Sequence, residues 1–229
     1  MSAIKRLVLT AVFAALAFAA MFVFRFNVSF LTFDLKDAVI TLSGLLLGPL
    51  TALTVSLLVA VLEFITVGDT GWYGFLMNFA SSAAFSVVCA VVYRYKKKLV
   101  GAILALVSGV IVLVAVMLAL NLVVTPFYME VPRSMVVKLI PTLFLPFNVV
   151  KGTINACLVL ILYKPIHRAM QATRLMPRSA SAPVGDVDPA VRKKRLWVSI
   201  TVSVAGLILL SAAIAVFVIV LHGQFELFG

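Results

Sequence analysis

The sequence contains few of the residues on which most enzymatic and metal-binding sites depend. Of its 229 residues, eight are acidic, two are histidine and two are cysteine. Both cysteines, Cys89 and Cys157, lie inside apolar runs, which makes a disulfide framework or a metal cluster improbable and favours small core side chains. The chain has no HExxH motif, no paired-histidine site and no glycine-rich phosphate loop. We therefore expect no enzyme, no catalytic residue, no bound cofactor and no metal.

Apolar residues dominate the chain instead. They make up 64% of it, charged residues make up 12%, and the mean hydropathy is +1.20. Soluble domains are about 45–50% apolar and about 25% charged, so the composition predicts an all-α fold, a polytopic membrane helix bundle. We expect a six-helix core over residues 1–166, a basic linker over residues 167–195 and one additional transmembrane helix over residues 196–222. The apolar runs span residues 7–24, 38–47, 50–67, 72–93, 99–124, 139–163 and 197–221.

Positive charge is distributed unevenly along these runs. The net charge is +11, and with a cytoplasmic N-terminus 14 of the 19 lysines and arginines fall on the cytoplasmic side. This distribution favours a cell-membrane protein with that orientation, and it disfavours nucleic-acid binding, which needs a basic face with base-reading or stacking groups. Residues 25–37 and 129–138 then form external connectors. We expect Pro126 to end the fifth span, and Pro141 and Pro146 to distort the start of the sixth.

The sixth span carries a polar stripe. Asn148, Lys151 and Asn155 follow one another at i, i+3 and i+7, which places them on one helical face. A lysine inside hydrocarbon costs roughly 2.5–3.5 kcal/mol on insertion scales, so it requires a partner or a function. A polar seam between packed helices is the structural alternative. We favour a ligand site.

Other polar residues converge on this stripe in the expected topology. Glu63 and Asn121 lie at the ends of spans that run outward. Asn78 lies at the start of a span that runs inward, and Asn148 and Lys151 lie at the start of another. All lie in the outer half of the membrane, beneath residues 25–37, and we expect Glu63 to reach the interface. The sequence therefore predicts a pocket that opens outward.

Five segments of the sequence carry a family resemblance over about residues 3–166. They read FLTFDLKD, LGPL, NFASS, NLVVTPFY and LPFNVVKGTINACLVLILYKPI. With these segments the chain resembles the substrate-binding S components of energy-coupling-factor (ECF) vitamin transporters, most closely those specific for riboflavin. The seventh apolar run and its linker depart from the family's six-helix pattern, so the resemblance implies nothing about them.

The resemblance implies a protein that captures riboflavin outside the cell. It would join a membrane scaffold subunit and two cytosolic ATPases, and topple to deliver the ligand. The flavin contacts map onto Asn121, Asn148 and Lys151, with the first external loop as a lid. Together with the converging residues above, the candidate ligand-binding residues are Leu31, Thr32, Phe33, Asp34, Glu63, Asn78, Asn121, Asn148 and Lys151.

The same resemblance implies that the scaffold docks on the alanines of the first span. Ala11, Ala15 and Ala19 recur at four-residue spacing, and this spacing makes a flat groove for a second helix. Ala11 and Ala15 are the expected docking residues. An internal packing face is the alternative.

Three other functions stay open at this point. FMN or another flat vitamin could be the ligand, and Lys36 or Arg25 could then hold the FMN phosphate. A membrane enzyme could use Asp34-x-x-Asp37 to bind a metal, although no catalytic motif accompanies that pair. A purely structural or regulatory membrane subunit would bind no small molecule.

Overall fold

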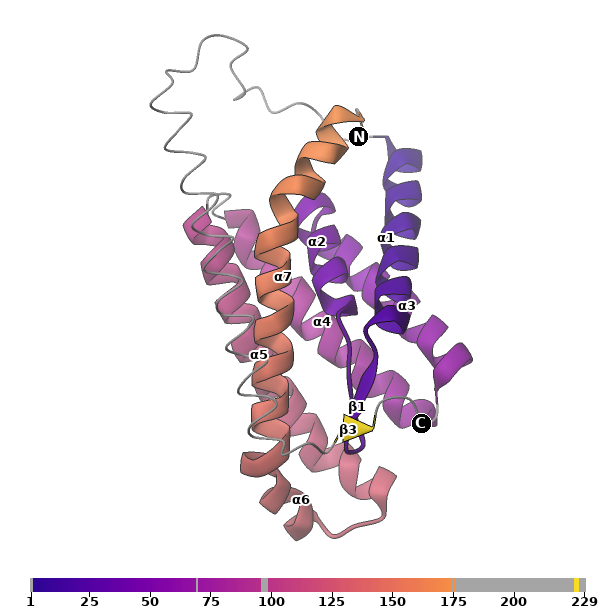
Figure 1. Cartoon of the computed structure of the whole chain (residues 1–229), viewed down its shortest axis with the longest axis vertical. Coiled ribbons are helices and arrows are strands. Elements are labelled where there is room, and N and C mark those ends of the chain that lie inside the picture. The colour runs from indigo at the N-terminus through magenta and orange to yellow at the C-terminus, as the bar shows by residue number, and fades with distance from the viewer. Residues whose placement is uncertain (1, 69, 96–98, 174, 176–224, 227–229) are drawn as a thin grey trace.

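The protein is a bundle of long helices with a small β-hairpin at the end opposite to the N-terminus (Figure 1). The structure, a computed structural model, describes residues 2–68, 70–95, 99–173, 175 and 225–226. Its elements are α1 (Ala3–Val23), β1 (Phe26–Val28), β2 (Leu31–Phe33), α2 (Lys36–Leu47), α3 (Pro49–Val67), α4 (Gly71–Tyr95), α5 (Leu99–Met129), α6 (Arg133–Leu139), the π-helix η1 (Ile140–Phe144), α7 (Leu145–Ala172) and β3 (Phe225–Glu226).

Five stretches of the described residues are long and apolar enough to cross a membrane. They are Ala3–Val23, Pro49–Val67, Gly71–Tyr95, Val100–Met129 and Arg133–Ala172. Each also packs against its neighbours through a buried face. The described residues form one large buried cluster within the bundle and a second, smaller one beneath the hairpin. The predicted all-α membrane bundle is confirmed, with the hairpin as its β element.

The short helix α2 lies at the centre of this bundle. Its 12 residues rise only about 18 Å, too little to cross a hydrocarbon layer of about 30 Å. Most of its side chains are buried against α1, α3, α4 and α7. Gly44 allows the close approach, because a Cβ there would lie 2.8 Å from the Cβ of Ala52 and 3.0 Å from that of Ala90. The second apolar run is therefore a core helix that begins inside the bundle and ends at the Gly48–Pro49 turn, beside Arg6 near the start of α1.

The prolines act differently at the two places where we expected them to interrupt helices. Helix α5 continues through Pro126 to Met129, so our prediction that Pro126 ends it is wrong. A membrane helix tolerates the one missing N–H when neighbouring groups compensate. At Pro141 the predicted distortion is confirmed as η1, in which Leu145 N donates to Ile140 O, five residues back. The connector over residues 129–138, which we expected outside the cell, also contains a helix, α6.

Helix α7 extends further than the sequence indicated. It continues through Pro165 to Ala172, so residues 167–172 of the expected linker are helical. Apart from residues 173, 175 and 225–226, the rest of the linker, the expected seventh span and the chain end lie outside the described residues. The strand β3 pairs with β1, with Asn27 opposite Glu226. The C-terminal end of α7 and β3 therefore lie at opposite ends of the bundle (Figure 1).

The alanines of α1 divide between two faces. Ala14 and Ala17 are buried in the core, whereas Ala11, Ala15 and Ala19 are exposed. The alternative interpretation of the exposed three as an internal packing face is therefore wrong. They form an outward-facing strip of small side chains.

Candidate ligand-binding site

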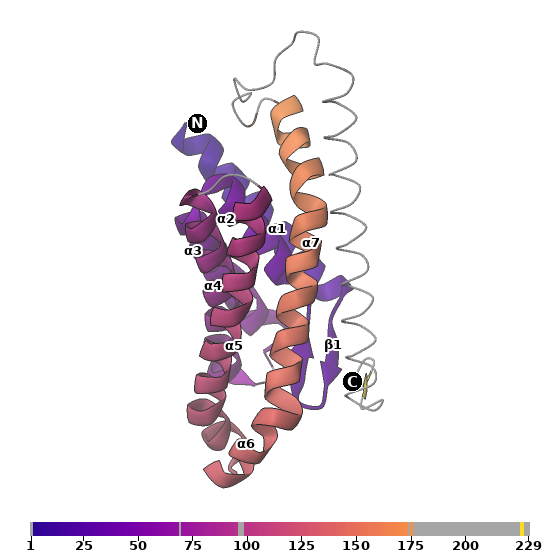
Figure 2. The same cartoon turned by 90° about the vertical axis from the view of Figure 1, so that its left-hand side faces the viewer.

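The hairpin is fixed to the bundle by aromatic packing. Antiparallel pairing places Phe26 opposite Phe33, and their rings stack with centroids 4.6 Å apart. Phe33 meets Phe147 edge to face at 6.5 Å, and Phe30 meets Phe144 in the same way at 5.8 Å. This aromatic cluster joins the hairpin to η1 and the first turns of α7. Figure 2 shows the hairpin beside α7. Connector residues 26–33 therefore form an ordered cover over that end of the bundle.

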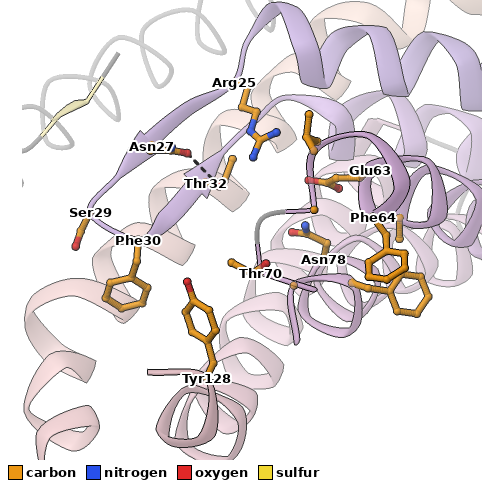
Figure 3. Close-up of a pocket in the computed structure, with 15 residues that line it drawn as sticks. Arg25, Asn27, Ser29, Phe30, Thr32, Glu63, Phe64, Thr70, Asn78 and Tyr128 are labelled. Atoms are coloured by element: carbon orange, nitrogen blue, oxygen red, sulfur yellow. Dashed lines mark hydrogen bonds between the residues drawn. The ribbon is translucent and has the colours of Figure 1, made fainter. Parts of the chain in front are cut away.

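Two adjoining cavities lie beneath this cover. The first, of about 200 Å³, is enclosed by the hairpin, α3, α4 and the end of α5 (Figure 3). The second, of about 100 Å³, lies between the hairpin, α4, α5 and α7. Their walls share Phe30, Thr32, Thr70, Gly74, Asn78 and Tyr128. We therefore treat them as two lobes of one candidate site.

Most of the predicted site residues line one of the two lobes. Glu63 lines the first lobe, and Thr32 and Asn78 line both. The second lobe also contains Leu31 of the hairpin and the residues that the fifth and sixth spans were expected to contribute: Asn121, Asn148 and Lys151. Phe33 and Asp34 line neither lobe; Phe33 belongs to the aromatic cluster, and Asp34 acts from behind the wall.

Asn121 and Asn148 are held rigidly by their own helices. The Nδ2 of Asn121 donates to Met117 O at 2.7 Å, and its Oδ1 accepts from Thr125 Oγ1 at 2.9 Å. The Nδ2 of Asn148 donates to Phe144 O at 2.8 Å, and among the described residues its Oδ1 has no hydrogen-bond donor. Both side chains are at most 1% exposed. The amide groups are therefore fixed in the wall before any ligand arrives.

Lys151 belongs to a buried charge cluster of five side chains, each at most 6% exposed: Asp34, Lys36, Asp37, Glu63 and Lys151. Its Nζ lies 3.1 Å from Asp34 Oδ2 and 3.9 Å from Asp37 Oδ2. Lys36 Nζ reaches the same Asp34 oxygen at 3.3 Å and donates to Glu63 Oε2 at 2.6 Å. Glu63, Lys36, Asp34 and Lys151 thus form a chain of ion pairs from α3 to α7.

Asp34 is the junction of this cluster. Its Oδ1 accepts from Lys36 N at 3.1 Å, and its backbone oxygen accepts from Asn155 Nδ2 at 3.3 Å. Burial by itself would raise the pKa of Asp34, but the ammonium groups of Lys151 and Lys36 outweigh burial and lower that pKa to about 2. At neutral pH Asp34 is therefore an anion that holds Lys151 in the cavity wall.

The carboxylate oxygens of Asp37 have fewer hydrogen-bond donors than those of Asp34. Ser82 donates to its Oδ1 at 2.5 Å, whereas its Oδ2 has no hydrogen-bond partner within the described residues. The cluster also holds three carboxylates against two ammonium groups. Asp37 Oδ2 is therefore the unsatisfied buried oxygen of the cluster among the described residues.

One expectation about the acidic residues is wrong, and the alternative of a metal at Asp34-x-x-Asp37 gains no support. Glu63 does not reach the interface; it is 4% exposed because Lys36 holds it inside. The pair Asp34-x-x-Asp37 faces lysines, and no group of three or more potential His, Cys, Asp or Glu metal ligands occurs in the described part of the chain. These carboxylates neutralise lysines.

Sequence reasoning missed Lys36 and Asp37 as members of the cluster, and it missed Phe30 and Tyr73 as wall residues. A lysine flanked by two aspartates in the same connector could have indicated the cluster. The pairing with Lys151, across 117 residues of sequence, has no local signal. Asn155 lies behind the site, where its Oδ1 accepts from Ala38 N at 2.8 Å and so secures α2.

Comparison with known families decides the class of protein. The sequence profile of the family described as "ECF transporter, substrate-specific component" matches residues 5–163, well over half of the chain. The chain belongs to this family. It is therefore the substrate-binding S component of a multi-pass membrane transporter rather than an enzyme.

Individual relatives agree with this assignment. The S component is 27% identical over 172 residues to the riboflavin transporter RibU of Staphylococcus aureus, a match that covers 70% of this chain and 89% of that protein. A solved structure described as the S component of a bacterial ECF transporter superposes with a TM-score of 0.64 at 25% identity, covering 74% of this chain and 99% of that one.

Proposed function

We propose that this S component captures riboflavin in the two-lobed site and delivers it for import. The observation that carries the proposal is that Asn121, Asn148 and Lys151, from two different helices, line one lobe together. The similarity to a riboflavin transporter supports the choice of ligand.

The chemistry of the wall suits a flavin. A flavin ring is flat and largely apolar, and one edge alternates carbonyl acceptors with an imide N–H. The Lys151 ammonium has three N–H donors, of which Asp34 takes one, so it can still donate to a ring carbonyl. The Asn148 Oδ1 can accept from the imide. Phe30, Tyr128 and Phe147 supply the apolar and aromatic surface for the ring.

The charge cluster favours riboflavin over FMN. Lys36, which could have held a phosphate, is 1% exposed and already pairs with Glu63 and Asp34. Lys151 in the second lobe likewise has a carboxylate partner, Asp34, which offsets its attraction for an anionic ligand. Arg25 lines the first lobe, so FMN remains the second candidate, with its phosphate placed there.

Ligand entry requires the hairpin to act as a lid. Sites for small ligands usually have volumes of about 300–1,000 Å³, and neither lobe reaches this alone. Phe30 and Thr32 of the hairpin belong to both walls, so outward movement of the hairpin merges the lobes. The resulting site opens at the end of the bundle opposite to the N-terminus, which we place outside the cell.

The energy for import comes from partners in this proposal. A scaffold subunit docks on the exposed alanine strip of α1, and two cytosolic ATPases drive the cycle. Ala15→Trp should block close helix approach, so complex formation and uptake should fall while flavin affinity stays unchanged. Ala14→Trp, on the buried face, is the contrasting variant, because it should disturb folding itself.

The absorption spectrum and a fluorescence-quenching titration test the ligand directly. Purified full-length protein should carry flavin bands or quench riboflavin fluorescence on binding, and FMN should bind more weakly. Arg25→Gln should weaken FMN more than riboflavin. If neither flavin binds to folded protein, the proposed ligand is wrong, although membership of the family stands.

A further inference from the structure

A separate cavity of about 460 Å³ lies at the opposite end of the bundle, where α1 begins. The Gly48–Pro49 turn between α2 and α3 forms its floor, and the last turn of α4 forms one wall. Arg6 and Arg94 line it together with leucines of α2 and α3. The riboflavin proposal makes no use of this cavity.

The two arginines have no anionic partner in the described part of the chain. No aspartate or glutamate lines the cavity, and neither guanidinium takes part in a salt bridge among the described residues. Two cations that line one concave surface repel each other, and a bound anion would remove that repulsion.

The position of Arg6 at the start of α3 adds to this unfavourable positive charge. Its Nη2 and Nε donate to Thr51 Oγ1 at 3.2 and 3.4 Å, in the first turn of α3. A Cβ placed on Gly48 would lie 3.9 Å from the same Nη2. The start of a helix carries partial positive charge, so a cation there is unfavourable, whereas an anion is stabilised by both the arginine and the helix.

An apolar strip leads away from the cavity along α3. Leu50 lines the cavity and is 69% exposed, and Leu53 and Leu57 follow at i+3 and i+7 with 40% and 44% exposure. This spacing places the three leucines on one outer face of the helix. A cationic hollow joined to an exposed apolar strip matches a molecule with an anionic head and an acyl chain.

We propose that this cavity binds an anionic phospholipid. The headgroup phosphate lies between Arg6 and Arg94 at the start of α3, and an acyl chain follows Leu50, Leu53 and Leu57. Basic pockets between membrane helices on the cytoplasmic side are suited to such headgroups. A bound lipid would hold α1, the α2–α3 turn and α4 together at this end.

The test titrates phosphatidylglycerol into delipidated full-length protein and counts bound lipids by native mass spectrometry. Arg94→Gln and Arg6→Gln should each lower the apparent affinity about fivefold, and the double variant should lower it more. Arg94→Gln is the cleaner variant, because Arg6 also supports Thr51. The matched control is Lys164→Gln with Arg168→Gln, which removes two charges from α7 without touching the cavity wall.

A specific site predicts a large loss of phosphatidylglycerol affinity in the Arg6→Gln/Arg94→Gln variant and a loss of less than twofold in the Lys164→Gln/Arg168→Gln control. Equal losses of affinity in the two double variants would mean diffuse electrostatic attraction and overturn the proposal. Displacement of the lipid by inorganic phosphate at a similar concentration would mean a free-anion site. Unchanged lipid binding, with loss of assembly in the double variant, would assign the cavity to a protein partner. Riboflavin binding should be the same in all variants, so this test is independent of the proposed ligand.

Discussion

The two ends of the bundle differ in how their charged side chains are buried and paired. Beneath the hairpin, five charged side chains are almost completely buried, and four of them form a continuous chain of ion pairs. At the end where α1 begins, Arg6 and Arg94 are exposed around a cavity and lack carboxylate partners within the described residues. In our proposals, the paired charges in the interior position a lysine for riboflavin, whereas the two arginines at the other end bind the headgroup of an anionic lipid.

Removal of Lys36 should have the largest effect on stability. Lys36→Met strands Glu63 as a buried, unpaired carboxylate, and loss of one partner of such a pair typically costs about 3–5 kcal/mol in the free energy of unfolding. Thermal and denaturant unfolding in detergent measure this cost. Lys138→Met, on the exposed side of α6, is the control and should change stability very little. A stable Lys36→Met protein would contradict the view that the cluster is structural.

Removal of Lys151 should chiefly affect ligand binding. Lys151→Met keeps the apolar stem and loses the donors, so riboflavin affinity should fall by roughly 10- to 150-fold, equivalent to about 1.5–3 kcal/mol. Asn148→Ala should have a similar or somewhat smaller effect. Asn155→Leu should lower the melting temperature more than the affinity, because Asn155 bonds Ala38 and Asp34 behind the site. Unchanged affinity in folded Lys151→Met would remove this lysine from the site.

A double-mutant cycle can show whether Asp34 acts through Lys151. Asp34→Asn keeps the shape but loses the charge that orients the ammonium, so riboflavin affinity should fall about fivefold. In the Lys151→Met background the same change should have almost no further effect on affinity. An equal effect in both backgrounds would mean that Asp34 influences the ligand by another route, such as the hairpin.

Arg94→Gln should have the smallest effect of the series. Among the described residues Arg94 forms no ion pair, so in neutral detergent its removal should change the unfolding free energy by less than about 0.5 kcal/mol. An effect should emerge only when anionic lipid is added. A large destabilisation in neutral detergent would reveal a partner of Arg94 within the chain and so weaken the contrast between the two ends.

Periodicity predicted the long helices and part of the site, because both depend on local spacing. The i, i+3, i+7 pattern placed Asn148, Lys151 and Asn155 on one face, and the expected topology brought Asn121 near them. The partner of each buried charged side chain could not be predicted in this way. The sequence indicated only that Lys151 needs a partner or a function; its partner is Asp34, because the hairpin returns the chain into the bundle before α2 begins.

The π turn Ile140–Phe144 acts as a phase correction between α6 and α7. It contains one residue more than a regular turn, so the two helices are out of register by about 100° relative to an unbroken α-helix. With that offset Val136 of α6 and Asn148 of α7 both face inward. Deletion of one residue here would restore regular winding and leave Val136 and the polar stripe of α7 on the same face, whereas winding the present residues as a regular α-helix would rotate Val136 away from that face. The wide turn therefore accommodates one extra residue while the two helices stay in phase.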